Sequence, residues 1–239
     1  MSYAAKEIKR LSGRALHRWK MISGGDRIMV AVSGGKDSLA LLWLLRERLA
    51  RVPVDYELTA VHVDPGFGAD SAARTAAWFE ENGFVYRVIR SDFGPRAHGP
   101  ENRENPCFLC SRLRRKALFE KAAELGCSKI AFGHHKDDVI ETLFVNIFYG
   151  ASISTMKPVQ TFFNGEVTVI RPLYLVDESL VERYSREMGW PEIDLGCPSA
   201  GSTKRKEVRD MLRSFYRRNR KIKGNIFHAL SNVREDYLP

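Results

Sequence analysis

The most restrictive feature of this sequence is the alternation of short apolar segments with longer amphipathic ones. Within 239 residues, strand-like segments are predicted over 26–32, 56–64, 84–89 and 129–132. Between and after them, helices are predicted over 39–49, 70–82, 111–125 and 137–149. Strands that alternate with helices predict an α/β fold, with an open parallel sheet and helices on both faces.

The rest of the chain is predicted to be less regular. A basic amphipathic helix is predicted over 4–20 and a further strand over 167–170, whereas 91–106 is rich in Pro, Gly and Asn and is predicted to be a loop. After residue 178 the pattern is mostly helical. We therefore expect three parts: a basic N-terminal helix packed on the main domain (1–25), the α/β domain (26–178) and a basic helical C-terminal segment (179–239).

Positive charge is concentrated at the two ends of the chain. The net charge is +9, but residues 202–223 alone carry +8 and residues 1–20 carry +5. A polyanion such as nucleic acid is the natural partner of such ends, although a solvated basic face is the simpler alternative.

No run of eighteen apolar residues and no signal-peptide pattern is present, so we expect a cytoplasmic protein with no membrane partner.

The stretch S-G-G-K-D-S follows the apolar segment 26–32 directly. In an open parallel sheet, ligands bind beyond the carboxyl ends of the strands. Glycines let the backbone approach an anion closely, and the N-terminus of the next helix supplies free N–H groups. This pattern predicts a phosphate-binding loop made by Ser33, Gly34, Gly35, Lys36, Asp37 and Ser38. A plain turn is the alternative, but such a turn does not need two glycines, a lysine and two hydroxyls together.

A second polar segment, G-H-H-K-D-D, follows the predicted strand 129–132. The sheet would place Gly133 and His134 beside the first loop. Asp137 is the favoured Mg²⁺ ligand, together with Asp37, although acidic residues are also common in the first turn of a helix. Asp64, at the end of the strand 56–64, is a weaker candidate for the nucleotide site and could equally cap its strand.

The four cysteines suggest metal chemistry. Cys107 and Cys110 form a C-x-x-C that is expected to precede a helix, and Cys197 stands alone later in the chain. A redox pair and a zinc half-site remain open, but three thiolates suit a [4Fe–4S] cluster with one iron open to another ligand. Cys127 is predicted to be a small buried hydrophobe, with a catalytic persulfide as the alternative.

Taken together, these segments resemble the tRNA 2-thiocytidine synthetase family, iron–sulfur-dependent thiolation enzymes of the PP-loop ATP pyrophosphatase superfamily. The resemblance runs from about residue 5 almost to the end. The segments that carry it are S-G-G-K-D-S, P-C-F-L-C-S-R, G-H-H-K-D-D-V-I-E-T, M-K-P, I-R-P-L and the late Cys197.

The resemblance implies an adenine nucleotide alpha hydrolase-like fold in which 26–178 binds ATP. It also implies Mg²⁺ and a [4Fe–4S] cluster on Cys107, Cys110 and Cys197, the last contributed by the C-terminal segment. The implied reaction activates C2 of a tRNA cytidine at anticodon-loop position 32 by adenylation and replaces O2 with sulfur, with Lys36, Asp37 and Asp137 as catalytic residues. The implied partners are tRNA and a sulfur donor, either a cysteine desulfurase or sulfide, and such proteins are commonly homodimers.

Two groups of basic residues are candidates for holding the tRNA backbone, because phosphate contacts give affinity without reading sequence. They are Arg112, Arg114 and Arg115 after the C-x-x-C, and Arg209, Arg213, Arg217, Arg218 and Lys221 near the C-terminus. Three other functions remain open: a cluster-free ligase such as a lysidine synthetase, a 2-thiouridine-forming enzyme, and a non-catalytic RNA-binding protein.

Overall fold

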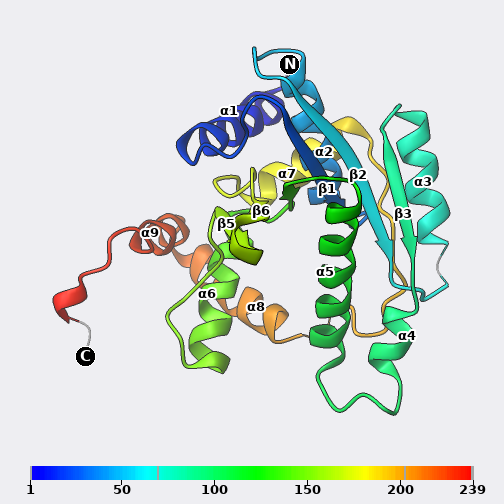
Figure 1. Cartoon of the computed structure of the whole chain (residues 1–239). Helices are drawn as coiled ribbons and strands as arrows, with labels where there is room; N and C mark the ends of the chain where they lie inside the picture. The colour runs from blue at the N-terminus through cyan, green and yellow to red at the C-terminus, as the bar shows by residue number, and fades with distance from the viewer. Residues whose placement is uncertain (1, 69, 202, 238–239) are drawn as a thin grey trace. The chain divides into compact units, whose positions relative to one another are not determined.

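The computed structural model describes residues 2–68, 70–201 and 203–237 (Figure 1). Contacts within the chain group it into two compact units. The first unit comprises Met1–His135 and Pro158–Ala200, and the second comprises Lys136–Lys157 and Gly201–Pro239. The division of the chain at residues 25 and 178 stays a prediction.

The first unit is built on a sheet whose described strands run in the order β3-β2-β1-β4-β6-β5. All neighbouring pairs are parallel except β5 and β6, which are antiparallel. The predicted parallel α/β sheet is therefore confirmed, with one antiparallel edge strand that the sequence pattern did not reveal. The strands are β1 (Asp26–Val32), β2 (Tyr56–Asp64), β3 (Tyr86–Arg90), β4 (Lys129–Ala131), β5 (Val159–Phe162) and β6 (Val167–Ile170).

Helices cover both faces of this sheet, as predicted. Leu118 and Ala122 of one helix pack on a core that includes Met29 and Val61. On the other side, Trp43 and Trp78 of two further helices both contact the ring of Trp190. The helices of the first unit are α1 (Tyr3–Arg18), α2 (Lys36–Leu49), α3 (Ser71–Glu81), α4 (Phe93–His98), α5 (Pro106–Glu124) and α7 (Glu178–Met188), with a 3-10 turn, η1 (Phe163–Gly165).

Two expectations about residues 91–125 were wrong. The predicted loop contains the short helix α4, in which Gly94 lies so close to the Phe67 ring that an added Cβ would be 2.4 Å from it. This packing is a tertiary contact, which a local Pro/Gly-rich pattern does not reveal.

The helix predicted from residue 111 begins at Pro106, because the Asn105 side chain accepts hydrogen bonds from the N–H groups of Cys107 and Phe108. Both cysteines of the C-x-x-C therefore lie on the helix.

The second unit consists of helices around a small apolar core. Ile140, Val208 and Leu212 are buried together in it. Its helices are α6 (Lys136–Gly150), α8 (Lys204–Arg218) and α9 (Lys221–Ala229), and η2 (Glu235–Tyr237) follows near the end of the chain. No helix among the residues that the structure describes is both long and apolar enough to cross a membrane.

Cys127 lies in the apolar core of the first unit. Its side chain is 5% exposed and belongs to the same cluster as Met29 and Ile130. Burial raises the pKa of its thiol, which disfavours the nucleophilic thiolate. The prediction of a buried structural cysteine is confirmed.

We expect Cys127→Ala to keep the protein folded and fully active, because a buried thiol of this kind contributes only packing. Cys127→Ser should lower the melting temperature more, since a hydroxyl buried without a partner costs about 1–3 kcal/mol. Thermal unfolding of both variants measures this order. A catalytic persulfide would instead make Cys127→Ala inactive although folded.

Candidate active site

The loop S-G-G-K-D-S joins the end of β1 to the start of α2, as predicted. Gly34 has φ +87°, a left-handed conformation that favours glycine, and Gly35 precedes the first helical residue. The Ser38 hydroxyl donates to the Gly35 carbonyl (2.9 Å) and accepts from the Ser33 N–H (3.1 Å). These bonds close the loop around the N-terminus of α2, where free N–H groups favour an anion.

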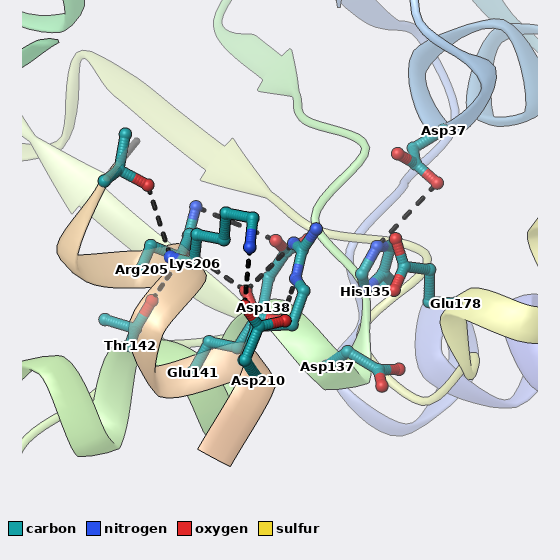
Figure 2. Close-up of polar contacts among 12 residues, drawn as sticks. Asp37, His135, Asp137, Asp138, Glu141, Thr142, Glu178, Arg205, Lys206 and Asp210 are labelled. Atoms are coloured by element: carbon teal, nitrogen blue, oxygen red, sulfur yellow. Dashed lines mark hydrogen bonds and ion pairs between the residues drawn. The ribbon is translucent and has the colours of Figure 1, made fainter. Parts of the chain in front are cut away.

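The second polar segment reaches this loop by a close backbone approach. β4 is the direct neighbour of β1, so the residues after both strands meet at one edge of the sheet. A Cβ on Gly133 would be 2.9 Å from both the carbonyl carbon and the carbonyl oxygen of Asp37. The imidazole Nε2 of His135 lies 3.7 Å from the Asp37 carboxylate (Figure 2). The two segments therefore lie together at Gly133 and His135, and the assignment of Gly133 and His134 to the nucleotide stays a prediction.

Lys36 is held in its charged form. Its ammonium group lies 3.2 Å from the Glu178 carboxylate, at the start of α7, and 3.4 Å from that of Asp37. Burial lowers the pKa of Lys36, but the two carboxylates outweigh it and raise the pKa above its ordinary value. Glu178 was missed in the sequence, where nothing distinguishes it from an acidic residue in the first turn of a helix.

The other two acidic candidates have protein partners. The Asp64 carboxylate accepts hydrogen bonds from the Gly66 N–H (3.0 Å) and the Ser71 hydroxyl (3.3 Å), which is the strand-end role considered as its alternative. Asp137, in the second unit, lies 2.5 Å from the ammonium of Lys223. The assignments of Asp64 to the nucleotide and of Asp37 and Asp137 to Mg²⁺ stay predictions.

Three of the cysteines, Cys107, Cys110 and Cys197, lie in the first unit. Cys107 and Cys110 are one turn apart at the N-terminal end of α5. Burial raises the pKa of the Cys110 thiol; the Arg114 guanidinium lowers it, and negative charge on Cys197 and Cys107 raises it. Cys197, from a distant segment, therefore lies within electrostatic reach of Cys110.

No group of three or more His, Cys, Asp or Glu side chains within the described ranges is arranged at metal-binding distances. The three thiols are free and partly exposed, and three thiolates are a donor set that suits an iron–sulfur centre. Cys107 and Cys110 already lie one helical turn apart. A smaller structural rearrangement would therefore bring their thiols to metal-binding distance than cysteines scattered along the chain would need.

Arg114 has a different setting from the phosphate contact proposed in the sequence. Burial lowers its pKa, while the Cys110 and Cys197 thiolates raise it, so the guanidinium lies next to the thiols. The Arg114 guanidinium also lowers the pKa of His62. Burial of His62 lowers this pKa most, so the imidazole stays neutral. The His62 Nδ1 lies 2.8 Å from the carbonyl of Val32, directly before the glycine loop. The sequence did not single out His62, and it singled out Arg114 only as a phosphate contact.

The segment that carries Cys197 is tied to α4. The Nδ1 of His98 lies 2.9 Å from the Gly94 carbonyl, which can only accept, so this nitrogen carries the proton. The Ser199 hydroxyl, two residues after Cys197, then donates to the His98 Nε2 at 2.8 Å. The helix that was missing from the sequence prediction therefore anchors the third cysteine.

Several basic candidates for RNA binding have acidic partners. Arg209 is bound by Glu141, only 3% exposed, through two hydrogen bonds of 2.6 and 3.1 Å, and Arg205 contacts the same carboxylate (Figure 2). Arg112 lies 3.2 Å from Glu104. Arg115 is exposed on α5, and Arg217 and Arg218 end α8. Binding of RNA by these residues, and by Arg213 and Lys221, stays a prediction.

Comparison with known proteins agrees with this geometry. Residues 4–193 match the model of a family described as the PP-loop domain. A tRNA-cytidine(32) 2-sulfurtransferase from Alkalilimnicola ehrlichii is 42% identical over 98% of this chain and 75% of its own length. A second, from Geobacter sulfurreducens, is 38% identical over 98% of this chain and 92% of its own. The chain belongs to the family of tRNA-cytidine(32) 2-sulfurtransferases within the PP-loop proteins.

A solved structure is similar over nearly the whole chain. It is the U34-tRNA thiolase NcsA from Methanococcus maripaludis with its [4Fe–4S] cluster, with a TM-score of 0.80 and 25% sequence identity. The match covers 99% of this chain and 80% of that one. The U34-tRNA thiolase thus shares the fold described above, and the matches to the tRNA-cytidine(32) 2-sulfurtransferases confirm the family resemblance seen in the sequence.

We expect Gly133→Ala to weaken ATP binding by at least tenfold. The new Cβ would lie against the Asp37 backbone, which has no flexible end to move away, so the two loops must separate. Gly24→Ala is a matched control, because nothing lies within 4 Å of its added Cβ. Equilibrium binding of ATP measures both, and equal affinities would contradict the proposed role of the close approach.

We expect His98→Ala to release the Cys197 segment while the nucleotide loop stays intact. The variant should therefore lose iron faster than the wild-type protein during anaerobic gel filtration after reconstitution, with unchanged ATP affinity. His17→Ala, at an exposed position of α1, controls for loss of a histidine. Iron retention equal to that of the wild type would show that the Ser199–His98 bond is dispensable.

Proposed function

We propose that this protein is an ATP-dependent tRNA sulfurtransferase. Its substrate is a cytidine at position 32 of the anticodon loop, in which O2 is replaced by sulfur. Curated relatives with this activity in their names align with 98% of the chain at 38–42% identity. The observation that carries the proposal is the glycine loop at the carboxyl end of β1, with Cys107 and Cys110 one turn apart on α5 in the same unit.

Activation of the base is assigned to the glycine loop and its neighbours. The cytidine O2 attacks the α-phosphorus of ATP, and pyrophosphate leaves, so that O2 becomes part of a good leaving group. The N-terminus of α2 and the protonated Lys36 stabilise the negative charge on the phosphates. Their contribution is positioning and charge stabilisation, which dominate phosphoryl chemistry.

Sulfur then replaces the activated oxygen. A sulfur atom at the sulfide level forms a bond to C2, and AMP departs with the original O2. Inorganic sulfide supplies this sulfur directly, whereas the persulfide of a cysteine desulfurase supplies it after two-electron reduction by an external thiol. Cys107, Cys110 and Cys197 would hold a [4Fe–4S] cluster, which supplies an open iron that can bind sulfur. Asp37 and Asp137 would hold Mg²⁺, which neutralises phosphate charge. Arg114 provides the positive charge beside the thiolates.

The alternatives differ in one measurable property each. Thiolation of a uridine is the nearest, because the similar NcsA structure is a U34-tRNA thiolase, but at 25% identity that relative is more distant than the cytidine enzymes. A lysidine-synthetase-like ligase needs no iron, and an RNA-binding protein without catalysis would not release AMP. The sulfur donor and a homodimeric state stay predictions.

The test joins metal content to product analysis. We expect protein purified without oxygen to contain about four iron and four sulfide per chain. Cys107→Ala, Cys110→Ala and Cys197→Ala should each lose the iron and the activity, whereas Cys127→Ala should keep both. The purified protein is then incubated with tRNA, ATP and sulfide. Mass spectrometry of the nucleosides from this tRNA should show 2-thiocytidine.

Three outcomes would contradict the proposal. Protein without iron after anaerobic reconstitution would exclude the cluster. 2-Thiouridine in place of 2-thiocytidine would change the substrate. Full thiolation by Cys197→Ala would remove the third cysteine from the mechanism.

A further inference from the structure

An exposed apolar surface lies in the second unit, at the C-terminal end of α6. Ile147, Phe148, Tyr149 and Ile153 are 39%, 50%, 45% and 73% exposed, and every residue from 147 to 154 is exposed. Burying these side chains in a core would be favourable, so a run of this kind on the surface points to a binding role.

The conformation of this segment is fixed by its own hydrogen bonds. The Asn146 side-chain amide donates to the Ser154 carbonyl (2.9 Å) and to the Ser154 hydroxyl (3.0 Å). The Ser152 N–H donates to the Asn146 carbonyl at 3.1 Å. Ala151 has φ +46°, which is unfavourable for a residue with a Cβ. The bonds on either side hold this residue in place, so the rings of Phe148 and Tyr149 are presented on a preformed surface.

Positive charge adjoins these rings. The Lys204 ammonium lies 4.4 Å from the centre of the Tyr149 ring, and the Tyr149 hydroxyl donates to Glu207 at 2.8 Å. Phe148 contacts the Phe144 ring, with centres 5.7 Å apart. The second unit as a whole carries a net charge of +6. Aromatic faces next to cations are the pattern by which proteins bind unpaired nucleotides.

We propose that Phe148, Tyr149 and Lys204 form a stacking surface for unpaired bases of the RNA substrate. The proposal rests on the proposed function, because the anticodon loop supplies such bases. The rings stack on the bases without reading their identity, and Lys204 contacts a neighbouring phosphate.

Charge favours RNA over a second copy of the chain as the occupant. A symmetric dimer through this surface would bring two units of charge +6 together. The same positive charge instead favours the binding of polyanionic RNA. Lys204 beside Tyr149 would face its own copy in the dimer, whereas in the complex with RNA it would face phosphate.

The test measures the affinity of the full-length protein for two RNAs. One is an anticodon stem-loop, and the other is a fully paired duplex of equal length. We expect Phe148→Ala and Tyr149→Ala each to weaken binding of the stem-loop by about tenfold or more, in line with stacking on one base. Binding of the duplex should stay unchanged, because its bases are already stacked. Tyr149→Phe keeps the ring and is the matched control, with stem-loop affinity within about twofold of the wild type.

A second measurement needs no substitution. A stem-loop with 5-iodouridine in its loop, irradiated in complex with the wild-type protein, should crosslink to the peptide that contains residues 147–154. Thermal unfolding and ATP binding of the alanine variants show whether they keep the wild-type fold.

The outcomes separate this inference from the proposed function. If the wild-type protein thiolates tRNA but folded alanine variants bind the stem-loop normally, or if crosslinks fall only elsewhere, the stacking surface is wrong and the enzyme assignment stands. If the variants change the oligomeric state in sedimentation, the surface is a self-interface and the inference is also wrong. If the wild-type protein binds neither RNA, both proposals fail.

Discussion

The close approach between Gly133 and Asp37 is the contact on which the rest of the site depends. β1 lies between β2 and β4 in the sheet, so three strand ends meet around the glycine loop. Only a residue without a Cβ fits here, because a Cβ at Gly133 would lie 2.9 Å from the Asp37 backbone in the first turn of α2. The same contact places His135 beside Asp37. A phosphate-binding loop and a second polar segment thus become one site because two parallel strands are neighbours.

The cysteines depend on a different kind of support. Cys107 and Cys110 are positioned by the Asn105 cap at the start of α5, whereas Cys197 is held through Ser199 and His98 of α4. The positive charge of Arg114 lowers the pKa of the Cys110 thiol, which burial raises. Short-range bonds therefore position two of the cysteines, and a long-range bond holds the segment of the third.

Charge in the second unit serves two purposes. The buried Glu141 binds Arg209 and Arg205, and this pairing keeps α8 on α6 because a buried carboxylate without partners would be very unfavourable. An arginine bound in this way serves the packing of its own unit first. The Lys204–Tyr149 contact, in contrast, leaves both groups on an exposed surface. The positive charge of the second unit is thus divided: Arg209 and Arg205 stabilise its packing, and Lys204 is left for the proposed binding of RNA.

The sequence by itself determined the parallel α/β fold, the glycine loop, the helix that follows it and the buried state of Cys127. These features follow from local patterns, namely apolar periodicity, turn residues and spacing along the chain. Only the tertiary structure decided that Glu178 pairs with Lys36, that Arg114 lies beside the thiols, and that His98 anchors the segment of Cys197. Each of these contacts joins residues of distant segments or depends on burial, and no local pattern encodes which distant partner a side chain meets.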